Sequence, residues 1–593
     1  MLTALAKYYD AQVQRGAMPK EGWAVTKVSG AIELDESGKV LAIHDLQWTE
    51  VIKTKTKSGK ESEKKRIHPA LMTVPQIPGR TVNIAPGFLC DNTKYIFGFE
   101  KGKTKSFDKN FEAFRDLHLR MISELDTPAA RALREFLTQD ENRKLTEEVE
   151  NSLLTGNYVF RFNGKYLHEY PEFSSVWDNR QISSLEDKEG ICSLTGMKDV
   201  IVATHPLIMG VPGAKSAGAA LVSYNSSAFE SYGKTQNMNS HIGRRASLKY
   251  TAALNQLIAS DKSHTQIGDT IIVYWAESAV PIYQTVFSGM LGNSVQEDTQ
   301  KLIDSLFKAI RNHKAIDIEE LKLQQKFYIL GLSANAARLV VRFFYEETFG
   351  DLIKNFADHN KRMEIEKPDY EQPGPLSPSQ IVFATVSRKS KDKKPLPSLP
   401  GDLMSSILLN TSYPESLYGN VLLRIRTDPA SFDAKKAAIL KGYLIKNKKN
   451  GGLTMSLNEA NNSQPYVLGR LFSILEFLQK SAAGGDLNST IKDKYFASAA
   501  ATPGRIFPLL IHNSANHLKK IKQGEKAAVF YDKKIGQLID RLGTAFPNTL
   551  SLEEQGEFYI GYYQERQHQF AQIKAAKEAK TKQKTHDNQE ENK

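Results

Sequence analysis

The stretch FYILGLSANAARLVVRFFYEETFGDLIKNF, from Phe327 to Phe356, sets the fold class of this chain. It opens with an apolar run, Phe327–Leu332, that is typical of a buried strand, and the small residues Ser333–Asn335 predict a turn. After Ala336 and Ala337, the eight letters RLVVRFFY from Arg338 are rich in β-branched and aromatic residues and favour a second strand. Upstream, DTIIVYWAE at Asp269–Glu277 predicts another buried strand, so this part of the chain contains a sheet.

Towards the N-terminus, strands and helices alternate. AIELDESGKVLAIHDLQ predicts a hairpin that turns at Glu36-Ser37-Gly38. FDKNFEAFRDLHLRMISEL, with Phe107, Phe111 and Phe114 at helical spacing, predicts an amphipathic helix. A short amphipathic helix is expected at the N-terminus and another at about Ser247–Ile258. The polar, basic run from Thr54 to Arg66 is expected to be a loop between strands.

The composition changes between Lys367 and Gly401, where KPDYEQPGPLSPS and RKSKDKKPLPSLPG are rich in proline, serine and lysine. We therefore predict an α/β region over residues 1–370, a linker over 371–400 and a helical bundle over 401–593. Helices are expected at 402–411, 414–426, 431–447, 464–482, 488–499, 503–521, 525–544 and 551–576. The fold class is α+β: a mixed N-terminal region followed by an all-helical C-terminal bundle.

Charge and composition limit the classes of partner and of function that this chain is expected to have. The 593 residues carry a formal net charge of +12, which indicates an acidic partner, with nucleic acid first. A membrane is the rival, but no apolar stretch approaches the roughly 20 residues that span a bilayer. The N-terminus does not resemble a signal peptide. Cys90 and Cys192 lie far apart, which excludes a disulfide framework and a structural zinc site made of cysteines alone. A cytoplasmic protein without a cofactor is expected.

Enzyme motifs are weak. His205, Asn225 and His241 would suit a metal-dependent nuclease, yet no carboxylate accompanies them at fixed spacing. The alternative is that His205 starts a turn before Pro206 and that Cys192 is buried. HPLIMGVPGAKSAG lacks the spacing of a phosphate-binding loop. We predict no catalytic residue and no metal ligand.

The most informative loop reads LVSYNSSAFESYGKTQNMNS, from Leu221 to Ser240. Amide side chains offer the paired donor and acceptor that base edges need, cations contact phosphates, and aromatic rings stack on unpaired bases. The loop and the residues just after it hold the amides Asn225, Gln236, Asn237 and Asn239, the cations Lys234, Arg244 and Arg245, the rings Phe229 and Tyr232, and a permissive Gly233. The alternative is an ordinary polar loop whose two rings enter the core, and composition leaves both interpretations open.

A second stretch, PGRTVNIAPGFLCDNTKYIFG at Pro78–Gly98, has the same character. Its candidates for DNA contact are Arg80, Asn83 and Lys94. The alternative is a turn between strands whose rings, Phe88, Tyr95 and Phe97, lie in the core.

Taken together, these stretches resemble one family, the large subunit of the subtype I-C CRISPR effector complex Cascade, known as the Csd family. The resemblance runs nearly end to end. It is carried by LTALAKYYD, IAPGFLCDNTKYIFG, LVSYNSSAFESYGKTQNMN, YTAALNQLI, GDTIIVYWAE, FYILGLSANAARLVVRFF, LLRIRTD, YVLGRLFSILEFLQ, IKDKYFASAAATPGRIFPLLI and EFYIGYYQERQ. Some relatives carry a second cysteine near the position of Cys192, which this chain lacks.

The resemblance implies a non-catalytic subunit at the foot of Cascade, beside the 5′ handle of the guide CRISPR RNA. Such a subunit contacts the backbone and handle-binding subunits, recognises the protospacer-adjacent motif in double-stranded DNA and helps to open the duplex. It holds the displaced strand and helps to recruit the helicase-nuclease. Pairing with the guide then reads the rest of the target. The rival functions are a metal-dependent DNA nuclease and a purely architectural subunit.

The resemblance also assigns roles to particular residues. The expected motif readers are Asn83, Asn225, Gln236 and Asn237. Backbone or stacking contacts are expected from Arg80, Lys94, Phe229, Tyr232, Gly233, Lys234, Arg244 and Arg245, and the displaced-strand path from Lys435, Lys436, Lys441, Lys446, Arg470, Arg505, Lys519 and Lys520. Lysines on such helices more often form a solvated face. An internal start at Met455 is expected to yield residues 455–593 as a separate small helical subunit.

Overall fold

A computed structural model describes the chain apart from residues 56–60, 79–83, 101–104, 147–149, 151–152, 180–187, 225, 313–320, 372–373, 485–486, 522–523 and 591–593. The chain forms two compact units. The N-terminal unit comprises residues 2–206 and 222–253, and the C-terminal unit comprises Met1 and residues 207–221 and 254–593.

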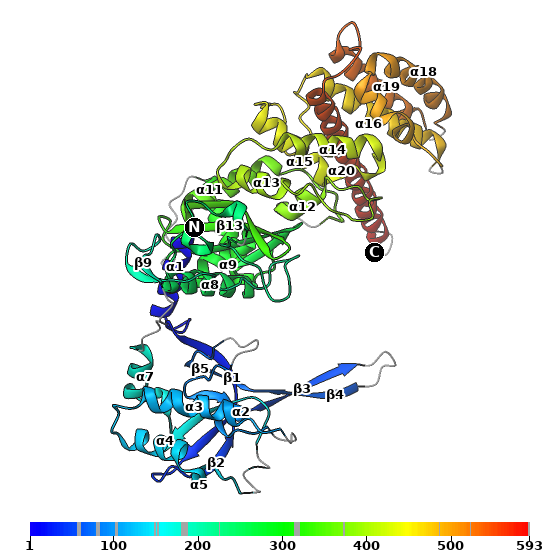
Figure 1. The fold of residues 1–593 in the computed structure, drawn as a ribbon. Coiled ribbons are helices and arrows are strands. Elements are labelled where there is room, and N and C mark those ends of the chain that lie inside the picture. The colour runs from blue at the N-terminus through cyan, green and yellow to red at the C-terminus, as the bar shows by residue number, and fades with distance from the viewer. Residues whose placement is uncertain are drawn as a thin grey trace. The chain divides into compact units, whose positions relative to one another are not determined.

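The N-terminal unit is built on a mixed sheet around strand β1, Trp23–Leu34 (Figure 1). Strand β2, Val40–Asp45, pairs antiparallel with the second half of β1 and forms the predicted hairpin. Strand β5, Ala70–Pro75, pairs antiparallel with the first half. Strand β7, Asn157–Phe162, runs parallel to β1, and the short β6, Cys90–Asn92, lies beyond it.

One face of this sheet is covered by helices. The predicted amphipathic helix is α3, Asp108–Met121, and it packs with α4, Pro128–Thr138, over Ile32 of β1 and Phe160 of β7. Alternate residues of each strand point to this face, as the pleat requires. The expected N-terminal helix is α1, Leu2–Gln14.

The prediction of a loop over Thr54–Arg66 is wrong for Thr54, Lys55 and Glu61–Arg66, which lie in strands, while residues 56–60 lie outside the described residues. Strands β3, Trp48–Lys55, and β4, Glu61–His68, pair in register as a two-stranded ribbon that extends away from the sheet (Figure 1). The sequence signal for a strand is alternation between a buried and an exposed face. A ribbon that projects from the sheet has no such requirement, so its polar, basic sequence gave no signal.

The C-terminal unit begins with the sheet that the opening stretch predicts. Its strands are β11, His264–Ile267, β12, Thr270–Ala276, β13, Lys326–Asn335, and β14, Arg338–Thr348, all antiparallel in this order. Every residue of β12 is buried. The turn lies two residues later than predicted, at Ala336-Ala337, where Ala336 adopts a positive φ of 53°. Two alanines carry none of the usual glycine or asparagine signal for such a turn.

Helices make up the rest of this unit. Near the sheet lie α9, Pro281–Met290, α10, Glu297–Arg311, α11, Phe349–Met363, and α12, Pro378–Phe383. The bundle follows with α13, Leu399–Leu408, α14, Glu415–Thr427, α15, Ala434–Asn447, α16, Gln464–Ala483, α17, Ile491–Ala501, α18, Pro503–Lys520, α19, Gly524–Leu542, and α20, Leu552–Glu590. Each of the eight predicted C-terminal helices corresponds to one of these, and the α+β fold class is confirmed.

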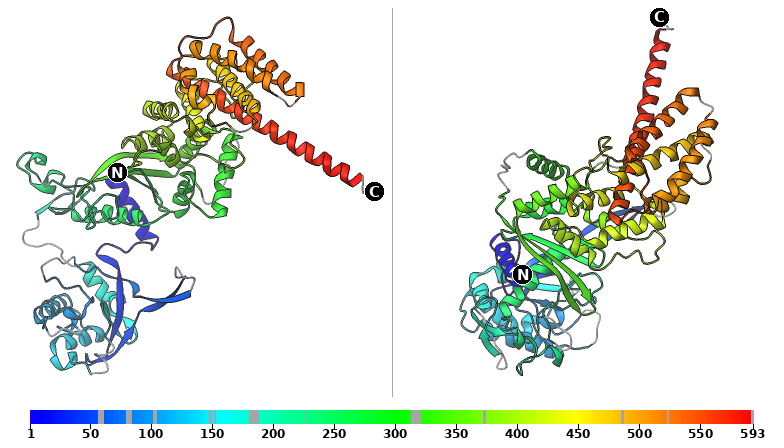
Figure 2. Two further views of the ribbon diagram at one scale, coloured as in Figure 1. Left: turned by 90° about the vertical axis from the view of Figure 1, so that its right-hand side faces the viewer. Right: turned by 90° about the horizontal axis from the view of Figure 1, so that it is seen from above.

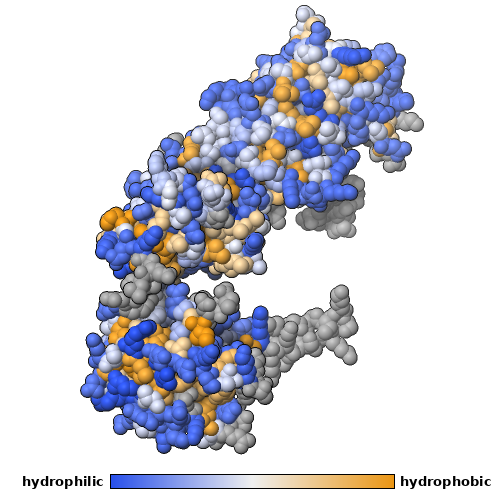
Figure 3. All heavy atoms as spheres, in the orientation of Figure 1, coloured by the Kyte–Doolittle hydropathy of each residue, from blue (hydrophilic) through white to orange (hydrophobic). Residues whose placement is uncertain are grey.

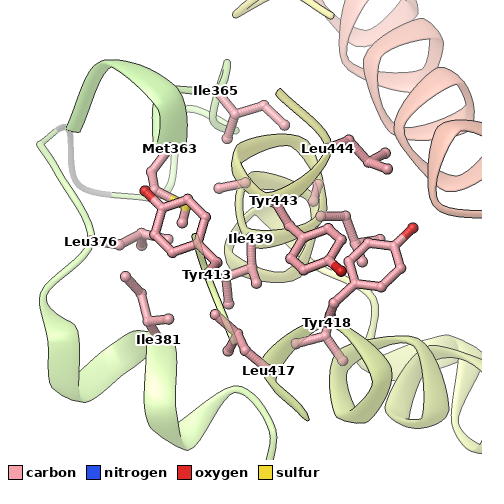
Figure 4. Close-up of a cluster of buried hydrophobic side chains, with 14 of the residues drawn as sticks. Met363, Ile365, Leu376, Ile381, Tyr413, Leu417, Tyr418, Ile439, Tyr443 and Leu444 are labelled. Carbon is pink, nitrogen blue, oxygen red and sulfur yellow. The ribbon is translucent and has the colours of Figure 1, made fainter. Parts of the chain in front are cut away.

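The hydrophobic core of the C-terminal unit runs without interruption from the sheet into the bundle. Figure 4 shows Met363, Leu376 and Ile381 beside Tyr413 and Leu417, which lie beyond the proline-rich segment. Residues of the segment predicted as a linker thus contribute to the core. Whether residues 401–593 fold by themselves stays a prediction.

The bundle is held together by a close crossing of α16 and α20. A Cβ atom at Gly469 would lie 1.9 Å from the carbonyl oxygen of Phe558, so only glycine permits this approach. Next to it, Arg470 Nε donates to Glu565 Oε2 at 2.9 Å in a fully buried ion pair. Beyond the crossing, α20 extends past the other helices of the bundle (Figure 2).

On the face drawn in Figure 3, hydrophobic residues lie scattered among hydrophilic ones. Among the helices that the structure describes, none combines the length and the apolar character needed to cross a bilayer.

Candidate nucleic-acid interface

The informative loop is anchored by a small β-ribbon in the N-terminal unit. Strands β9, Lys188–Ile191, and β10, Lys198–Ile201, are joined by a turn in which the Cys192 amide donates to the carbonyl oxygen of Met197 at 2.8 Å. The Cys192 Sγ accepts the Gly243 amide at 3.2 Å, and the Ser193 amide donates to the His241 carbonyl at 2.8 Å. The ribbon is therefore tied to the end of the loop, just before helix α8, Arg244–Ala259.

The Cys192 thiol serves this anchor. Burial alone raises the pKa of Cys192, but donors from Thr195, Gly243 and Leu194 together bring it below its usual value. The sulfur thus acts as a hydrogen-bond acceptor that gathers main-chain amides at the turn.

Asn237 is a structural residue of the loop. Its side chain is only 2% exposed, and its Nδ2 donates to the carbonyl oxygens of Val202 at 2.7 Å and Ile242 at 2.9 Å. Its Oδ1 accepts the hydroxyl of Ser240. The amide is therefore occupied inside the protein, and we do not carry Asn237 forward as a motif reader.

The rings of the loop point outwards. Tyr232 is 98% exposed and Phe229, at the end of the short helix η2, Ser227–Phe229, is 47% exposed. The interpretation in which both rings enter the core is therefore wrong. Tyr232 and Gly233 both adopt positive φ angles, 54° and 67°, and the Lys234 amide donates to the Ser231 carbonyl across them at 3.0 Å. This is the hydrogen-bonded reversal of a type I′ turn.

Gln236 is the exposed amide of the loop. It begins the short helix η3, Gln236–Asn239, with a positive φ of 45°, and the structure leaves its side chain at the surface beside the exposed Lys234. The third amide, Asn239, faces back into the loop and bonds its main chain. Asn225 lies outside the described residues. Of the loop amides that the structure describes, Gln236 alone is both exposed and directed to solvent.

Two arginines follow at the start of α8. The Arg245 side chain is mostly exposed, and its Nε lies 3.9 Å from Glu21 Oε1. Its main-chain amide donates to Asp199 Oδ2 at 3.0 Å, which fixes the helix start to β10. Arg244 is partly buried. Arg245 remains available to an anionic ligand at the cost of a weak surface ion pair.

In the second stretch, Arg80 and Asn83 lie outside the described residues. Phe88, Tyr95 and Phe97 are all buried, as its alternative interpretation predicts. Lys94 lies in helix α2, Thr93–Ile96, with its Nζ 3.1 Å from Glu100 Oε2 and 5.2 Å from the centre of the Phe107 ring. This lysine already has partners within the protein.

Most basic residues assigned to α15 and α16 are also used internally. Lys436 Nζ donates to the Ser431 carbonyl at 2.6 Å, and Lys446 Nζ donates to Asn410 Oδ1 at 2.8 Å. Burial lowers the pKa of Lys441 to about 8. Arg470 forms the buried pair with Glu565. By contrast, Lys435 is partly exposed, and three cations on α18 are exposed: Arg505, Lys519 and Lys520.

Comparison with known proteins decides the family. The profile of the CRISPR-associated protein family Cas_Csd1 matches residues 5–570. The chain belongs to the Cas_Csd1 family. This confirms the family predicted from the sequence and supports a role as a CRISPR-associated subunit of Cascade. No curated protein matches the chain.

In this Cas_Csd1 protein, the two histidines of the nuclease alternative, His205 and His241, differ in burial. His205 is buried, and its Nδ1 lies 2.5 Å from the Tyr250 hydroxyl. Burial lowers the pKa of His205, so its ring is neutral at pH 7. The His241 carbonyl belongs to the anchor described above. Within the described residues, no group of three or more histidine, cysteine or acidic side chains is placed to hold a metal ion.

Glu230 is a residue of the loop that the sequence analysis did not single out. Its Oε1 accepts a hydrogen bond from the main-chain N–H of Gln236 at 3.2 Å, and this bond closes the loop together with the bonds of Asn239. An acidic side chain in a loop expected to contact DNA would repel the phosphates. No motif or periodicity pointed to Glu230, because its role depends on the hydrogen bonds of the folded loop.

Proposed function

We propose that this chain recognises the protospacer-adjacent motif for Cascade through the exposed part of its loop 226–245 and thereby starts the opening of target DNA. The observation that supports this proposal is the division of the loop's side chains into those that hold the loop and those that are exposed. Asn237 and Asn239 hold the loop, whereas Gln236, Lys234 and Tyr232 are presented to solvent. An amide, a cation and a ring together can read a base edge, contact a phosphate and stack on an unpaired base.

We further propose that α18 holds the displaced strand. Arg505, Leu509 and His512 share one exposed face of this helix, since they follow each other at helical spacing, and Lys519 and Lys520 end it. Cations line up with the backbone of a single strand, and an apolar side chain between them offers a surface for a base. The buried cations of α15 and α16 do not belong to this path.

Family membership supports the remaining roles that we propose. The proposed partners are the guide RNA, the target duplex with its displaced strand, the backbone and handle-binding subunits of Cascade, and the helicase-nuclease that the subunit helps to recruit. The subunit would act without catalysis, in the cytoplasm. The nuclease alternative is not proposed, because His205 faces the interior.

Replacing Gln236 by alanine is expected to cost roughly 1–3 kcal/mol of binding to DNA with the correct motif, and much less on a scrambled motif. The reason is that a base-edge contact discriminates between sequences, whereas a phosphate contact does not. Binding of the assembled complex to both DNAs measures this, with Asn83→Ala and Asn225→Ala in the same series. Asn237→Ala is the control, because loss of a loop anchor weakens both DNAs. Equal losses for Gln236→Ala on both DNAs would contradict the assignment.

Replacing Arg505, Lys519 and Lys520 together by glutamine is expected to lower the slope of log K against log salt by about 2, at about 0.7 for each lost contact with a single strand. The matched control removes three exposed lysines elsewhere in the same unit, Lys391, Lys393 and Lys394. Binding of the complex to target DNA across a salt series gives both slopes. If the two triple variants behave alike, α18 is not the strand path.

A further inference from the structure

The Tyr232 turn adopts a conformation that its sequence does not favour. Type I′ turns need positive φ at both central positions, and asparagine or glycine is the usual first residue. Here the first position is a tyrosine, for which φ of 54° is uncommon. A Cβ atom at Gly233 would meet nothing within 4 Å, so this glycine is present for its backbone angle and not for space.

Asn239 holds this turn with both the oxygen and the nitrogen of its side-chain amide. Its Oδ1 accepts the Ser231 amide at 2.9 Å, and its Nδ2 donates to the carbonyl oxygens of Lys234 at 2.9 Å and Gln236 at 2.8 Å. These bonds reach the main chain on both sides of Tyr232-Gly233. Residues held in sparsely populated backbone regions persist only where the surroundings impose them.

Glu230 closes the same loop from its other end. Its carboxylate accepts a hydrogen bond from the main-chain N–H of Gln236 at 3.2 Å, which fixes the third residue of the loop with a positive φ. The side-chain amide of Asn237 also joins the loop to Val202, just after β10. The loop therefore fixes the main chain that carries the ring, although the ring itself is exposed.

We infer that Asn239 is a positioning residue, which with Glu230 imposes the Tyr232 turn so that the ring is presented as a stacking platform for an unpaired nucleobase. The inference rests on the proposed DNA-binding function of the loop. A nucleobase fits because both faces of the ring are open and because Lys234 and Gln236 stand exposed beside it. Order imposed before binding lowers the entropy that stacking would otherwise have to overcome.

The first test concerns the hold itself and needs no DNA. Hydrogen exchange of the full-length chain is followed in peptides covering residues 226–240. Asn239→Ala is expected to speed exchange of the Ser231 amide at least tenfold, and Glu230→Ala to do the same at Gln236. Glu230→Gln keeps an acceptor oxygen and is the matched control, expected to exchange like the native chain. Unchanged exchange in the alanine variants would overturn the inference.

The second test concerns the ligand and uses the assembled complex on target DNA with unpaired bases beside the motif. Tyr232→Ala and Asn239→Ala are each expected to weaken binding roughly 5- to 100-fold, as loss of one stacked base does. The double variant should be no more than about twofold weaker than the weaker-binding single variant, because Asn239 acts through the ring. Tyr232→Phe should bind normally.

The outcomes separate the inference from the function on which it rests. Fully additive losses would overturn the positioning role of Asn239 while leaving DNA binding by the loop intact. Faster exchange in Asn239→Ala with normal binding by Tyr232→Ala would instead show that the loop is held but reads no base, against the proposed function. A Tyr232→Ala chain that no longer joins Cascade would assign the ring to a protein partner and overturn the nucleobase assignment.

Discussion

Replacing Arg470 by methionine is expected to destabilise the helical bundle by about 3–5 kcal/mol. The guanidinium and its partner carboxylate on Glu565 are almost fully buried, with side-chain exposures of 3% and 2%. Removing one partner leaves an uncompensated charge in a medium of low polarity, which is the costly change at a buried ion pair. The pair also lies beside the close helix crossing at Gly469, where the backbone has no room to relax.

Hydrogen exchange in peptides from α16 and α20 measures this loss within the full-length chain, where a single unfolding transition is not expected. The expected stability loss corresponds to exchange about two to four orders of magnitude faster. The double variant Arg470→Met with Glu565→Leu should recover much of the protection, since two apolar residues can replace a buried pair. Arg505→Met, an exposed arginine of the same bundle, should change protection little. Normal protection in Arg470→Met would contradict the structural role.

The burial of Arg470 is a feature that the sequence pattern did not predict. The positions of the C-terminal helices followed from apolar periodicity, because burial of one helix face repeats with the helix turn. Lys436, Lys441 and Arg470 are buried, which the periodicity did not predict, and the ion-pair partner of Arg470 belongs to a distant segment. Glu565 lies on another helix far along the chain. Periodicity within one helix contains no information on such a partner.

The roles of the amide side chains in the loop could not be predicted from composition either. Composition correctly drew attention to a stretch rich in asparagine and glutamine, but it treated those side chains as equivalent. The structure divides them, because Asn237 bonds the carbonyl oxygens of Val202 and Ile242 and Asn239 bonds the turn, while Gln236 is exposed. That division depends on backbone angles such as the positive φ of Tyr232, which no residue-type signal at a tyrosine predicts.

The second large effect concerns residues 455–593, which we propose are also made separately from an internal start at Met455. Met455 lies in a loop before α16 and is 48% exposed, so a chain that begins there cuts no helix. Met404, the methionine that precedes it in the chain, is fully buried inside α13, and a start there would remove the first half of that helix. The fragment carries more basic than acidic residues.

The fragment keeps the contacts that make a core. Helix α16 packs against α18, α19 and α20, and all of them lie after Met455. The Arg470–Glu565 pair and the bond from the Tyr466 hydroxyl to Gln564 at 2.6 Å are internal to it. Such a bundle has the size of an ordinary domain. We therefore expect residues 455–593 to be soluble, helical and folded.

The fragment also loses one packed face. In the full chain, Phe432 contacts the rings of Phe496 and Tyr559, and the Tyr563 hydroxyl donates to the Glu366 carbonyl at 2.8 Å. Loss of the Phe432 contacts alone is expected to cost about 3–5 kcal/mol, as for a large core truncation. The isolated fragment should accordingly be less stable than the same helices in the full chain, and hydrogen exchange of α20 in both forms measures the difference.

Expression of the gene with a C-terminal tag decides whether the fragment is made. The masses of all tagged products are measured, and a species that begins at Met455 is expected beside the full-length chain. Changing Met455 to leucine with a codon that does not initiate should remove the short species and leave the long one, because side-chain size and apolar character are kept. A full-length product alone, or a short product that survives this change, would exclude Met455 as the start. Since proteolysis would not depend on an initiating codon, the leucine variant also separates internal initiation from cleavage in the exposed loop.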